Sequence, residues 1–392
     1  MLRLPIENIL DKEIKMRICK LSDIAKFTTG KLNSNAATMK GRYPFFTCAP
    51  EPLTIDTYAY DTKAVILAGN NAEGNFHIQY YEGKFNAYQR TYIIETNDET
   101  IVDIRYLYYA LKICLQHFKQ ISQGTATKFL TAKILNAFEL PIPRIEEQQK
   151  IAFLLAEIDE KIKINEIINN NLEQQAQAIF KSWFVDFELN YGVMPSDWKV
   201  SQLGSIVKIS TEVFSPAKNP NVEVEHYSIP AYDEKRYPIF ETSNGIKSNK
   251  YRLSSNSVMI SKLNPDTKRI WRPYCISDNP ICSTEFIVYE PINPLNRDFI
   301  YSIIDSIGFS AFLCSHTTGS TNSRQRATPS ITLTYDIVIP DEKTIQAFCS
   351  IVSPMYDTIE NNIKENQKLA KTRDKLLPKL MSGELDVSGI EL

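Results

Sequence analysis

Two long stretches of the chain share a pattern of hydrophobic positions spaced alternately four and three residues apart. They cover residues 145–184 and 342–381. A 3.5-residue repeat sustained over several heptads is typical of a coiled-coil seam, so we predict two long helices that pair along it. Two ordinary amphipathic surface helices are the alternative interpretation. The predicted seam residues are Leu155, Ile158, Ile162, Asn165, Asn169, Leu172, Ile179, Val352, Met355, Ile359, Asn362, Asn366, Leu369 and Leu376.

The two stretches are copies of one repeat. From Pro143 and Pro340 onward the sequences align without a gap, at an offset of 197 residues. A helix of about 35 residues is about 50 Å long. If the two helices pair antiparallel, they form a rigid spacer that holds a globular module at each end, related by a pseudo-two-fold axis.

Asparagine interrupts the seam at the same places in both copies. Asn165 aligns with Asn362, and Asn169 aligns with Asn366. A polar residue in a seam lowers stability but fixes the register, because a mispaired helix leaves a buried amide without a partner. We therefore predict a register function for these residues; the alternative is a wet edge of the helix.

A globular module precedes each long helix. Short β-branched and aromatic runs bounded by Asn, Gly and Pro predict strands. Matching runs lie at residues 21–24 and 203–206, 64–67 and 257–260, and 92–95 and 286–290. A helix with an apolar face is predicted over residues 103–119 in the first module and 297–314 in the second.

These elements predict an α/β fold of the mixed α+β type, with an internal repeat. We expect the first module over residues 1–142 and the first helix region over 143–195. The second module is expected over 196–340, and the second helix region over 341–392.

Basic, amide and small hydroxyl residues gather in loops of both modules. Such groups contact phosphate, and Arg, Lys and Asn also bond the edges of bases in the major groove. Each residue alone could instead be a solvated surface group, and Tyr43 and Tyr237 could instead belong to the core. The candidate DNA contacts are Lys31, Arg42, Tyr43, Asn70, Asn71, Arg90, Gly124, Thr125, Lys128, Arg236, Tyr237, Lys262, Asn264, Lys268, Arg269, Arg272, Ser320, Arg324 and Arg326.

Composition adds little in favour of DNA binding, because the formal net charge is −2. Both modules are mildly basic and both helix regions are acidic. The 7 cysteines lack CxxC spacing, which argues against a zinc ribbon or a disulfide framework and favours a cytoplasmic protein. The sequence also predicts no membrane span and no metal site.

Motifs for catalysis are missing from the sequence. There is no phosphate-binding GxxxxGK[ST] loop, no Gly-rich cofactor loop and no nucleophile elbow. The missing motifs predict a chain without an activity or a cofactor of its own, which agrees with a DNA-binding function. Two alternatives stay open: a coiled-coil assembly scaffold without sequence readout, and a methyltransferase or nuclease whose motifs have diverged.

Four strings resemble motifs of one known family. PIPRIEEQQKIAFLLAEIDEKI and LEQQAQAIFKSWF resemble the opening and the end of the conserved helix in specificity subunits of type I restriction-modification systems. LLPKLMSGEL resembles the end of the second repeat, and QGTATKFLT resembles a segment at the end of a target recognition domain. The string TGSTNSRQRATPS departs from that last pattern, so it supports no residue-by-residue transfer into the second module.

The resemblance implies a division of labour among subunits. Each target recognition domain reads one half of a bipartite, asymmetric site in double-stranded DNA, and the paired helices set the spacer between the halves. The helices also dock two methyltransferase subunits, which modify adenine N6 with S-adenosylmethionine. Restriction subunits with translocase activity join that core. S-adenosylmethionine, ATP and magnesium are thus expected on partner subunits.

Overall fold

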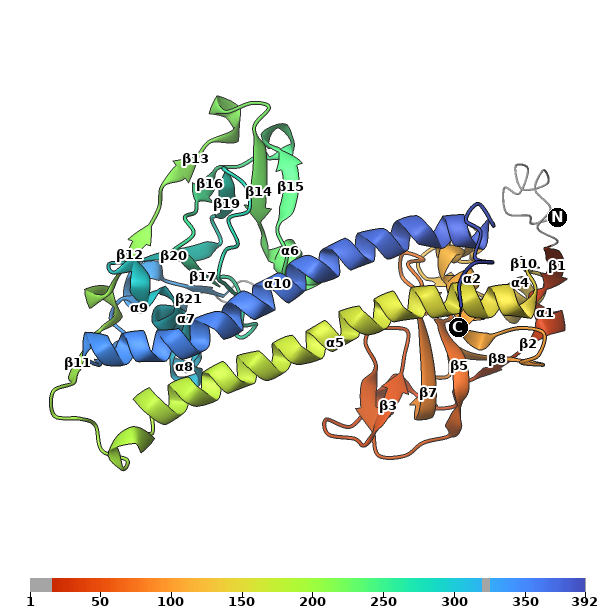
Figure 1. Ribbon diagram of the computed structural model, residues 1–392, viewed down its shortest axis with the longest axis horizontal. Helices are drawn as coiled ribbons and strands as arrows, with labels where there is room; N and C mark the ends of the chain where they lie inside the picture. The colour runs from red at the N-terminus through yellow and green to blue at the C-terminus, as the bar shows by residue number, and fades with distance from the viewer. Residues whose placement is uncertain (1–15, 319–324, 392) are drawn as a thin grey trace. The chain divides into compact units, whose positions relative to one another are not determined.

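The computed structural model describes residues 16–318 and 325–391, and the chain divides into two compact units. Unit 1 holds Met1–Ile162 with Lys368–Leu392, and unit 2 holds Lys163–Gln367. The helices α5 (Ile145–Phe184) and α10 (Glu342–Met381) are continuous, with 40 residues each, over the ranges that the heptad pattern predicts (Figure 1). Each unit therefore contains one module and part of each long helix. The four-part division of the chain stays a prediction, because the boundaries between the two units fall inside α5 and α10.

A six-stranded sheet forms the centre of unit 1. Its order is β2-β8-β5-β7-β3-β4, and all neighbours are antiparallel except β3 and β7. The strands β1 and β10 pair antiparallel, so the first and last strands of the module meet beside the start of α5. The bounds are β1 Arg17–Lys20, α1 Leu21–Ile24, β2 Ala25–Thr29, β3 Tyr43–Phe46, β4 Leu53–Ile55, β5 Tyr60–Ala68, β6 Asn70–Asn71, β7 Ile78–Ala87, β8 Thr91–Thr96, α2 Ile104–Ile113, α3 Leu115–Ile121, β9 Lys128–Phe129, α4 Ala132–Asn136 and β10 Glu139–Ile142.

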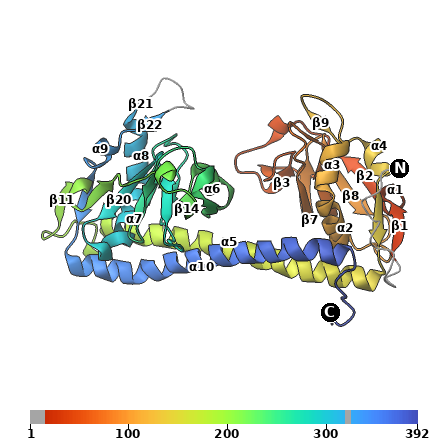
Figure 2. The same cartoon turned by 90° about the horizontal axis from the view of Figure 1, so that it is seen from above.

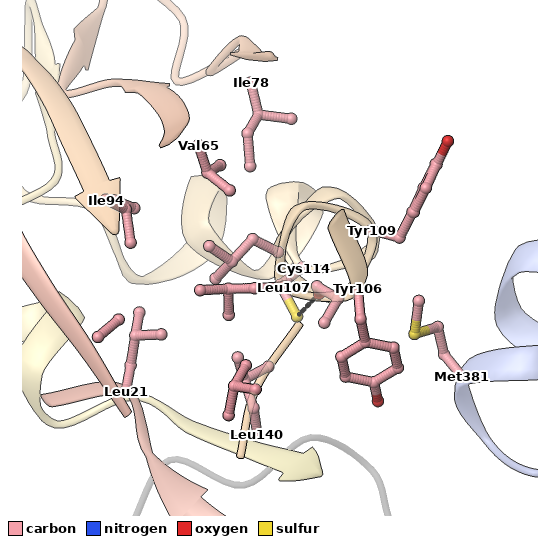
Figure 3. Packing of buried hydrophobic residues seen from close by; sticks show 14 of the residues in the cluster. Leu21, Val65, Ile78, Ile94, Tyr106, Leu107, Tyr109, Cys114, Leu140 and Met381 are labelled. Atoms are coloured by element: carbon pink, nitrogen blue, oxygen red, sulfur yellow. Dashed lines mark hydrogen bonds between the residues drawn. The ribbon is translucent and has the colours of Figure 1, made fainter. Parts of the chain in front are cut away.

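The hydrophobic core of unit 1 lies between this sheet and its helices. Val65 of the sheet, Leu107 of α2 and Leu140 of β10 are at most 1% exposed and belong to one cluster. Met381, at the end of α10, packs into the same cluster (Figure 3). The last turns of the chain's second long helix therefore complete the core of the first module.

Unit 2 repeats this plan with two sheets. The orders are β12-β20-β17-β18 and β13-β16-β19-β14-β15, and β11 pairs antiparallel with β23 as β1 does with β10. The bounds are β11 Lys199–Gln202, β12 Val207–Ser210, β13 Val213–Phe214, β14 Glu223–Tyr227, α6 Ile229–Lys235, β15 Ile239–Thr242, β16 Lys250–Arg252, β17 Val258–Ser261, β18 Ile270–Trp271, β19 Pro280–Ser283, β20 Phe286–Pro291, α7 Arg297–Asp305, α8 Ile307–Ser315, β21 Thr317–Thr318, β22 Arg326–Ala327, α9 Pro329–Thr332 and β23 Asp336–Ile339.

Two sequence predictions about local structure are wrong. Residues 21–24 form the short helix α1, and residues 203–205 form a 3₁₀ turn, where strands were predicted. In both places the buried leucine that opens the turn donates its backbone N–H to the far side of the module: Leu21 to Phe138 O, and Leu203 to Tyr335 O. Ser, Asp and Gly inside these runs favour a turn over a strand.

The predicted single helices over 103–119 and 297–314 are also each broken in two. Cys114 separates α2 from α3, and its Sγ donates to Ala110 O at 3.1 Å. Ser306 separates α7 from α8, and its hydroxyl accepts from Phe309 N at 3.1 Å as an N-cap. Local bonds of short polar side chains compete with helix continuation, and they do so here at equivalent places.

Within each unit, the segments of α5 and α10 run antiparallel (Figure 2). In unit 1, Arg373 pairs with Asp159 at 2.6 Å. In unit 2, Asn165 bonds Asn366 while Asn169 bonds Asn362, so residue numbers increase along α5 in the direction in which they decrease along α10. Every predicted seam residue is buried or half-buried. The fold is thus a mixed α/β repeat built around an antiparallel helix pair.

Candidate nucleic-acid interface

A two-stranded ribbon in unit 1 collects several of the predicted DNA contacts. The strands β6 and β9 pair antiparallel, with Asn70 opposite Phe129 and Asn71 opposite Lys128. Backbone bonds from Gly69 N to Arg90 O, and from Gln89 N to Leu32 O, bring two further loops beside the ribbon. We call residues 31–33, 69–71, 89–90 and 123–129 the module 1 polar cluster. It contains Lys31, Asn70, Asn71, Arg90, Gly124, Thr125 and Lys128.

The basic side chains of this cluster are not neutralised by any residue that the structure describes. No ion pair joins Lys31, Arg90 or Lys128 to another described residue. The Arg90 guanidinium lies 5.3 Å from the centroid of the Phe129 ring, which orients it without cancelling its charge. The cluster therefore keeps its positive charge available for an anion.

A sharp turn at Gly124 shapes the loop that leads into β9. Gln123 and Phe129 exchange both backbone hydrogen bonds, so the chain reverses over the residues between them. Gly124 has φ of +105°, and a Cβ there would lie 2.0 Å from Thr127 O. Only glycine fits this position, so the Gly in the QGTATKFLT string is required by the backbone.

Arg42 and Tyr43 lie apart from the cluster's centre. They stand at the start of β3, where Tyr43 contacts Tyr58 edge-to-face at 5.1 Å and the Arg42 guanidinium is 6.0 Å from the Tyr43 ring. The opposite end of β3 approaches the cluster, because Tyr88 N donates to Phe46 O. Arg42 is exposed, and its contact with DNA stays a prediction.

Unit 2 contains the same backbone framework with different side chains. Lys262 N bonds Glu285 O, and Ala327 N bonds Lys262 O, as Gly69 bonds Arg90 and Leu130 in unit 1. Lys262 therefore corresponds to Gly69, and Glu285 to Arg90. The Arg326 guanidinium bonds both carboxylate oxygens of Glu285, at 3.0 and 3.3 Å. A carboxylate thus occupies the position of the first module's arginine.

Other predicted contacts of the second module are also engaged in ion pairs. Arg236 bonds Glu173 of α5 at 2.7 Å, Lys268 pairs with Asp305 of α7, and Arg269 bonds both oxygens of Asp233 at 2.6 and 2.9 Å. Tyr237 is half-buried next to Phe240 and Tyr274, and Asn264 is half-buried beside Gln325. Ser320 and Arg324 lie outside the described residues.

Arg272 is an interior residue and not a surface contact. Its side chain is 8% exposed and bonds three carboxylates: Asp298 of α7 at 2.9 Å, and Asp357 and Glu360 of α10 at 2.5 and 3.0 Å. Desolvation acts to raise the pKa of the buried Asp298, but the charges of Arg272 and Arg297, together with hydrogen bonds, outweigh it and hold that pKa below its usual range. We therefore withdraw Arg272 from the candidate DNA contacts and assign it to the attachment of the module to α10.

In each repeat, the first long helix of the module (α2 or α7) is bonded to α5 or α10 through a different pair of side chains. In unit 1, Tyr109 of α2 donates to Asp159 of α5 at 2.8 Å, and both Arg373 and Lys112 lie within 4.0 Å of that carboxylate. Burial and the adjacent carboxylate raise the pKa of Tyr109. In unit 2, Ser302 of α7 bonds Tyr356 of α10 at 3.0 Å.

The asparagines of the seam bond one another in reciprocal pairs. Asn165 Nδ2 donates to Asn366 Oδ1 at 2.8 Å, and Asn362 Nδ2 donates to Asn169 Oδ1 at 2.8 Å. Because Asn165 aligns with Asn362, and Asn169 with Asn366, one bond is the image of the other under the repeat. Asn165 and Asn169 are 1% and 9% exposed. We call these four residues the asparagine ladder.

Comparison with known proteins agrees with this architecture. Residues 13–174 match the model of the type I restriction modification DNA specificity domain. The specificity subunit of the EcoDI enzyme from Escherichia coli is 28% identical over 285 residues, 64% of this chain and 63% of that subunit. The MjaIX specificity subunit from Methanocaldococcus jannaschii is 29% identical over 316 residues, 72% of this chain and 69% of that subunit.

The chain is therefore similar to specificity subunits of type I restriction enzymes over as much as 72% of its length, and its residues 13–174 match the type I DNA specificity domain. The match to the EcoDI subunit spans less than two thirds of that subunit's length. The fold is also similar to the crystal structure of the type I restriction-modification S subunit from M. genitalium. The TM-score is 0.63 at 17% identity, over 95% of this chain and 97% of that one.

A metal centre and an activated thiol are two groups that could support catalysis. Within residues 16–318 and 325–391, no three His, Cys, Asp or Glu residues are grouped to hold a metal ion. Burial raises the thiol pKa of Cys349 to about 11 and that of Cys114 to about 12, so both are protonated at neutral pH and poor nucleophiles.

No single helix in the described part of the chain is long and apolar enough to span a membrane. The bent helix pair Pro294–Asp305 and Ile307–Ser315 has the length and the apolar composition of a membrane span, but no other feature of the described residues points to one. Its residues Ile300, Ile304 and Phe309 are fully buried in the core of unit 2.

Sequence reasoning missed the residues that position the candidate contacts. Cys48 Sγ donates to Asn70 Oδ1 at 2.8 Å, and Lys119 Nζ donates to Asn75 Oδ1 at 2.7 Å beside the ribbon. The Asp159–Arg373 pair was also missed. A signal for that pair existed, since the seam position of Arg373 holds Ala176 in the other copy.

Proposed function

We propose that this chain is the specificity subunit of a type I restriction-modification system, that it binds double-stranded DNA, and that each of its modules reads one half of a bipartite, asymmetric site. The observation that carries the proposal is the module 1 polar cluster. Cations without an ion-pair partner among the described residues, half-buried amides and a tight hydroxyl-bearing loop gather on and beside a β-ribbon, and the major groove admits such a ribbon. The equivalent framework with different side chains in unit 2 supports a different base sequence for the second half.

We further propose that the paired helices set the spacer between the two halves. The asparagine ladder supports this role, because a slip of one helix against the other would leave buried amides without partners. A fixed register fixes how far apart two reading modules can stand, and half-site spacing follows from such geometry.

The same helices are proposed to dock two methyltransferase subunits. On α5 within unit 2, Ile164, Ile167 and Ile168 are 43%, 52% and 38% exposed and share one helix face. An apolar face of this kind fits a protein partner. In this proposal the chain is not catalytic and acts in the cytoplasm. Its partners, including restriction and translocase subunits, supply S-adenosylmethionine, ATP and magnesium.

The test is co-purification with the methyltransferase subunits, followed by mapping of methylated sites. We expect one two-part sequence. Replacing residues 17–142 with the module of another family member should change only one half. If both halves change, or neither, the modular proposal fails. The other two interpretations predict different results: a scaffold gives no sequence preference, and a diverged methyltransferase gives methylation by the isolated chain.

A further inference from the structure

We propose that Asn71 and Lys128 are specificity-determining residues that read a guanine in the half-site of module 1. This inference rests on the proposed function and deepens it from a DNA interface to a base.

The carboxamide of Asn71 has a fixed orientation. Its Oδ1 accepts from the backbone N–H groups of Glu73 at 2.9 Å and Asn75 at 3.0 Å. Only the oxygen of the amide can accept from two N–H groups, so the oxygen must face the turn. Both of its lone pairs are then used. Asn71 consequently offers a ligand its Nδ2 donor and no free acceptor.

That donor is available to a ligand. Asn71 Nδ2 donates to no other described residue. It is also not one of the buried side-chain atoms that lack a partner, so this nitrogen is accessible to solvent. The nearby Asn75 and Glu73 do not compete for it, because the Glu73 carboxylate accepts from Asn75 Nδ2 at 3.1 Å and Asn75 Oδ1 accepts from Lys119.

Lys128 supplies a second donor on the same face of the ribbon. It lies directly opposite Asn71 in the antiparallel pair, and directly opposite residues project from the same face. The other pair of the ribbon, Asn70 and Phe129, projects from the opposite face, where Asn70 accepts from Cys48 and Phe129 lies under Arg90. One face of the ribbon therefore presents two adjacent donors.

Two adjacent donors select guanine among the bases of the major groove. Guanine shows two neighbouring acceptors, O6 and N7, whereas adenine shows the N7 acceptor beside an N6 amino donor. An adenine would place its N6 hydrogens against Asn71 Nδ2 or Lys128 Nζ. The usual bidentate contact of Asn with adenine needs a free amide oxygen, and Asn71 has none.

The test exchanges one atom of Asn71. In Asn71→Asp, one carboxylate oxygen still accepts the two turn bonds, and the other replaces the donor with an acceptor. The complex with the methyltransferase subunits is given S-adenosylmethionine and a DNA library, and methylated sites are sequenced for both proteins. Asn136→Asp, an exposed change of equal charge in the same module, is the matched control.

For the wild-type complex, we expect a guanine in one half of the site. Asn71→Asp should reduce methylation of guanine sites by about fivefold to a hundredfold and raise the share of adenine or cytosine at that position alone. Lys128→Gln should weaken preference at the same position, while Asn136→Asp should leave the sequence unchanged.

Two results would overturn the inference while leaving the proposed function intact. One is a two-part site whose base preferences are the same for Asn71→Asp and Asn136→Asp. The other is a response of Asn71→Asp at a position that is not guanine. Absence of any two-part site in the wild-type complex would instead reject the proposed function, and the inference with it. Equal recovery of all variants in the complex excludes misfolding as the cause.

Discussion

The two modules share a backbone framework but differ in what surrounds their basic residues. In unit 1, Lys31, Arg90 and Lys128 have no ion-pair partner among the described residues. In unit 2, Arg236, Arg269 and the other predicted cations that the structure describes, except Lys262, each meet a carboxylate. Residue type alone therefore does not distinguish a DNA contact from an internal tie.

The difference has a physical consequence for each module. A cation already bonded to a carboxylate must give up that bond, or share its charge, before it can neutralise a phosphate. An unpaired cation needs only to release solvent and counterions. We therefore expect module 1 to supply more of the salt-dependent binding, whereas the paired cations of unit 2 stabilise the fold.

The largest expected effect is on stability, and it concerns Arg272. Arg272→Met leaves the buried carboxylate of Asp298 without its main partner, so the free energy of unfolding should fall by about 3–5 kcal/mol. Denaturant titration measures this. Lys128→Gln in module 1 should change the same quantity by less than about 0.5 kcal/mol. Equal losses in both variants would contradict the contrast between the modules.

The asparagine ladder is the place where the two repeats agree, and a paired variant tests it. Asn169→Leu removes the acceptor of Asn362 Nδ2 and should cost about 1–3 kcal/mol of unfolding free energy. The double change Asn169→Leu with Asn362→Leu should recover most of that loss. In the methyltransferase complex, the double variant should accept additional spacer lengths, and an unchanged single spacer would reject the register function.

A smaller effect separates the modules in DNA binding. Lys128→Gln should weaken binding several-fold and lower the slope of log affinity against log salt concentration by about one. Lys268→Gln, which changes a cation already paired with Asp305, should change the slope much less. Fluorescence anisotropy at several salt concentrations compares the two complexes. A larger slope change for Lys268→Gln would reverse the assignment.

The smallest effect concerns acidification of unit 2. Burial of His226 lowers the pKa of its imidazole and outweighs the hydrogen bond that Glu241 accepts from it, while Lys250 acts in the same direction as burial. The unfolded chain takes up this proton near pH 6.5. Below that pH the unfolded state binds more protons than the folded one, so stability falls as pH falls. His226→Gln should flatten this dependence between pH 7 and 5, as measured by thermal unfolding.

Much of the fold could be predicted from the sequence because the helices and the main strands carry strong periodic signals. The ranges 145–184 and 342–381 agree with α5 and α10. Local competition accounts for the misses. The turn at Leu21 depends on a bond to Phe138, more than a hundred residues away, and a short hydrophobic run does not reveal such a partner.

The candidate site could be predicted only in part. The QGTATKFLT string pointed to the loop around Gly124, and Asn70 and Asn71 stood out as adjacent amides. Their use depends on facts that one chain's sequence lacks: the register that places Asn71 opposite Lys128, and the turn that occupies the Asn71 oxygen. Arg272 was misassigned because its three carboxylates come from two helices distant in sequence.

The core of unit 1 has an implication for synthesis. Met381 and Leu380 pack against residues of the first module. Asn165 has its hydrogen-bond partner, Asn366, 201 residues later in the chain. On the ribosome, the first module and the seam face of α5 therefore emerge long before the segments of α10 that cover them. Domains usually fold in order as they are made, and exposed apolar surface favours aggregation. For this chain, the core of the first module is completed only after the final turns of α10 have been synthesised, although that module is made first.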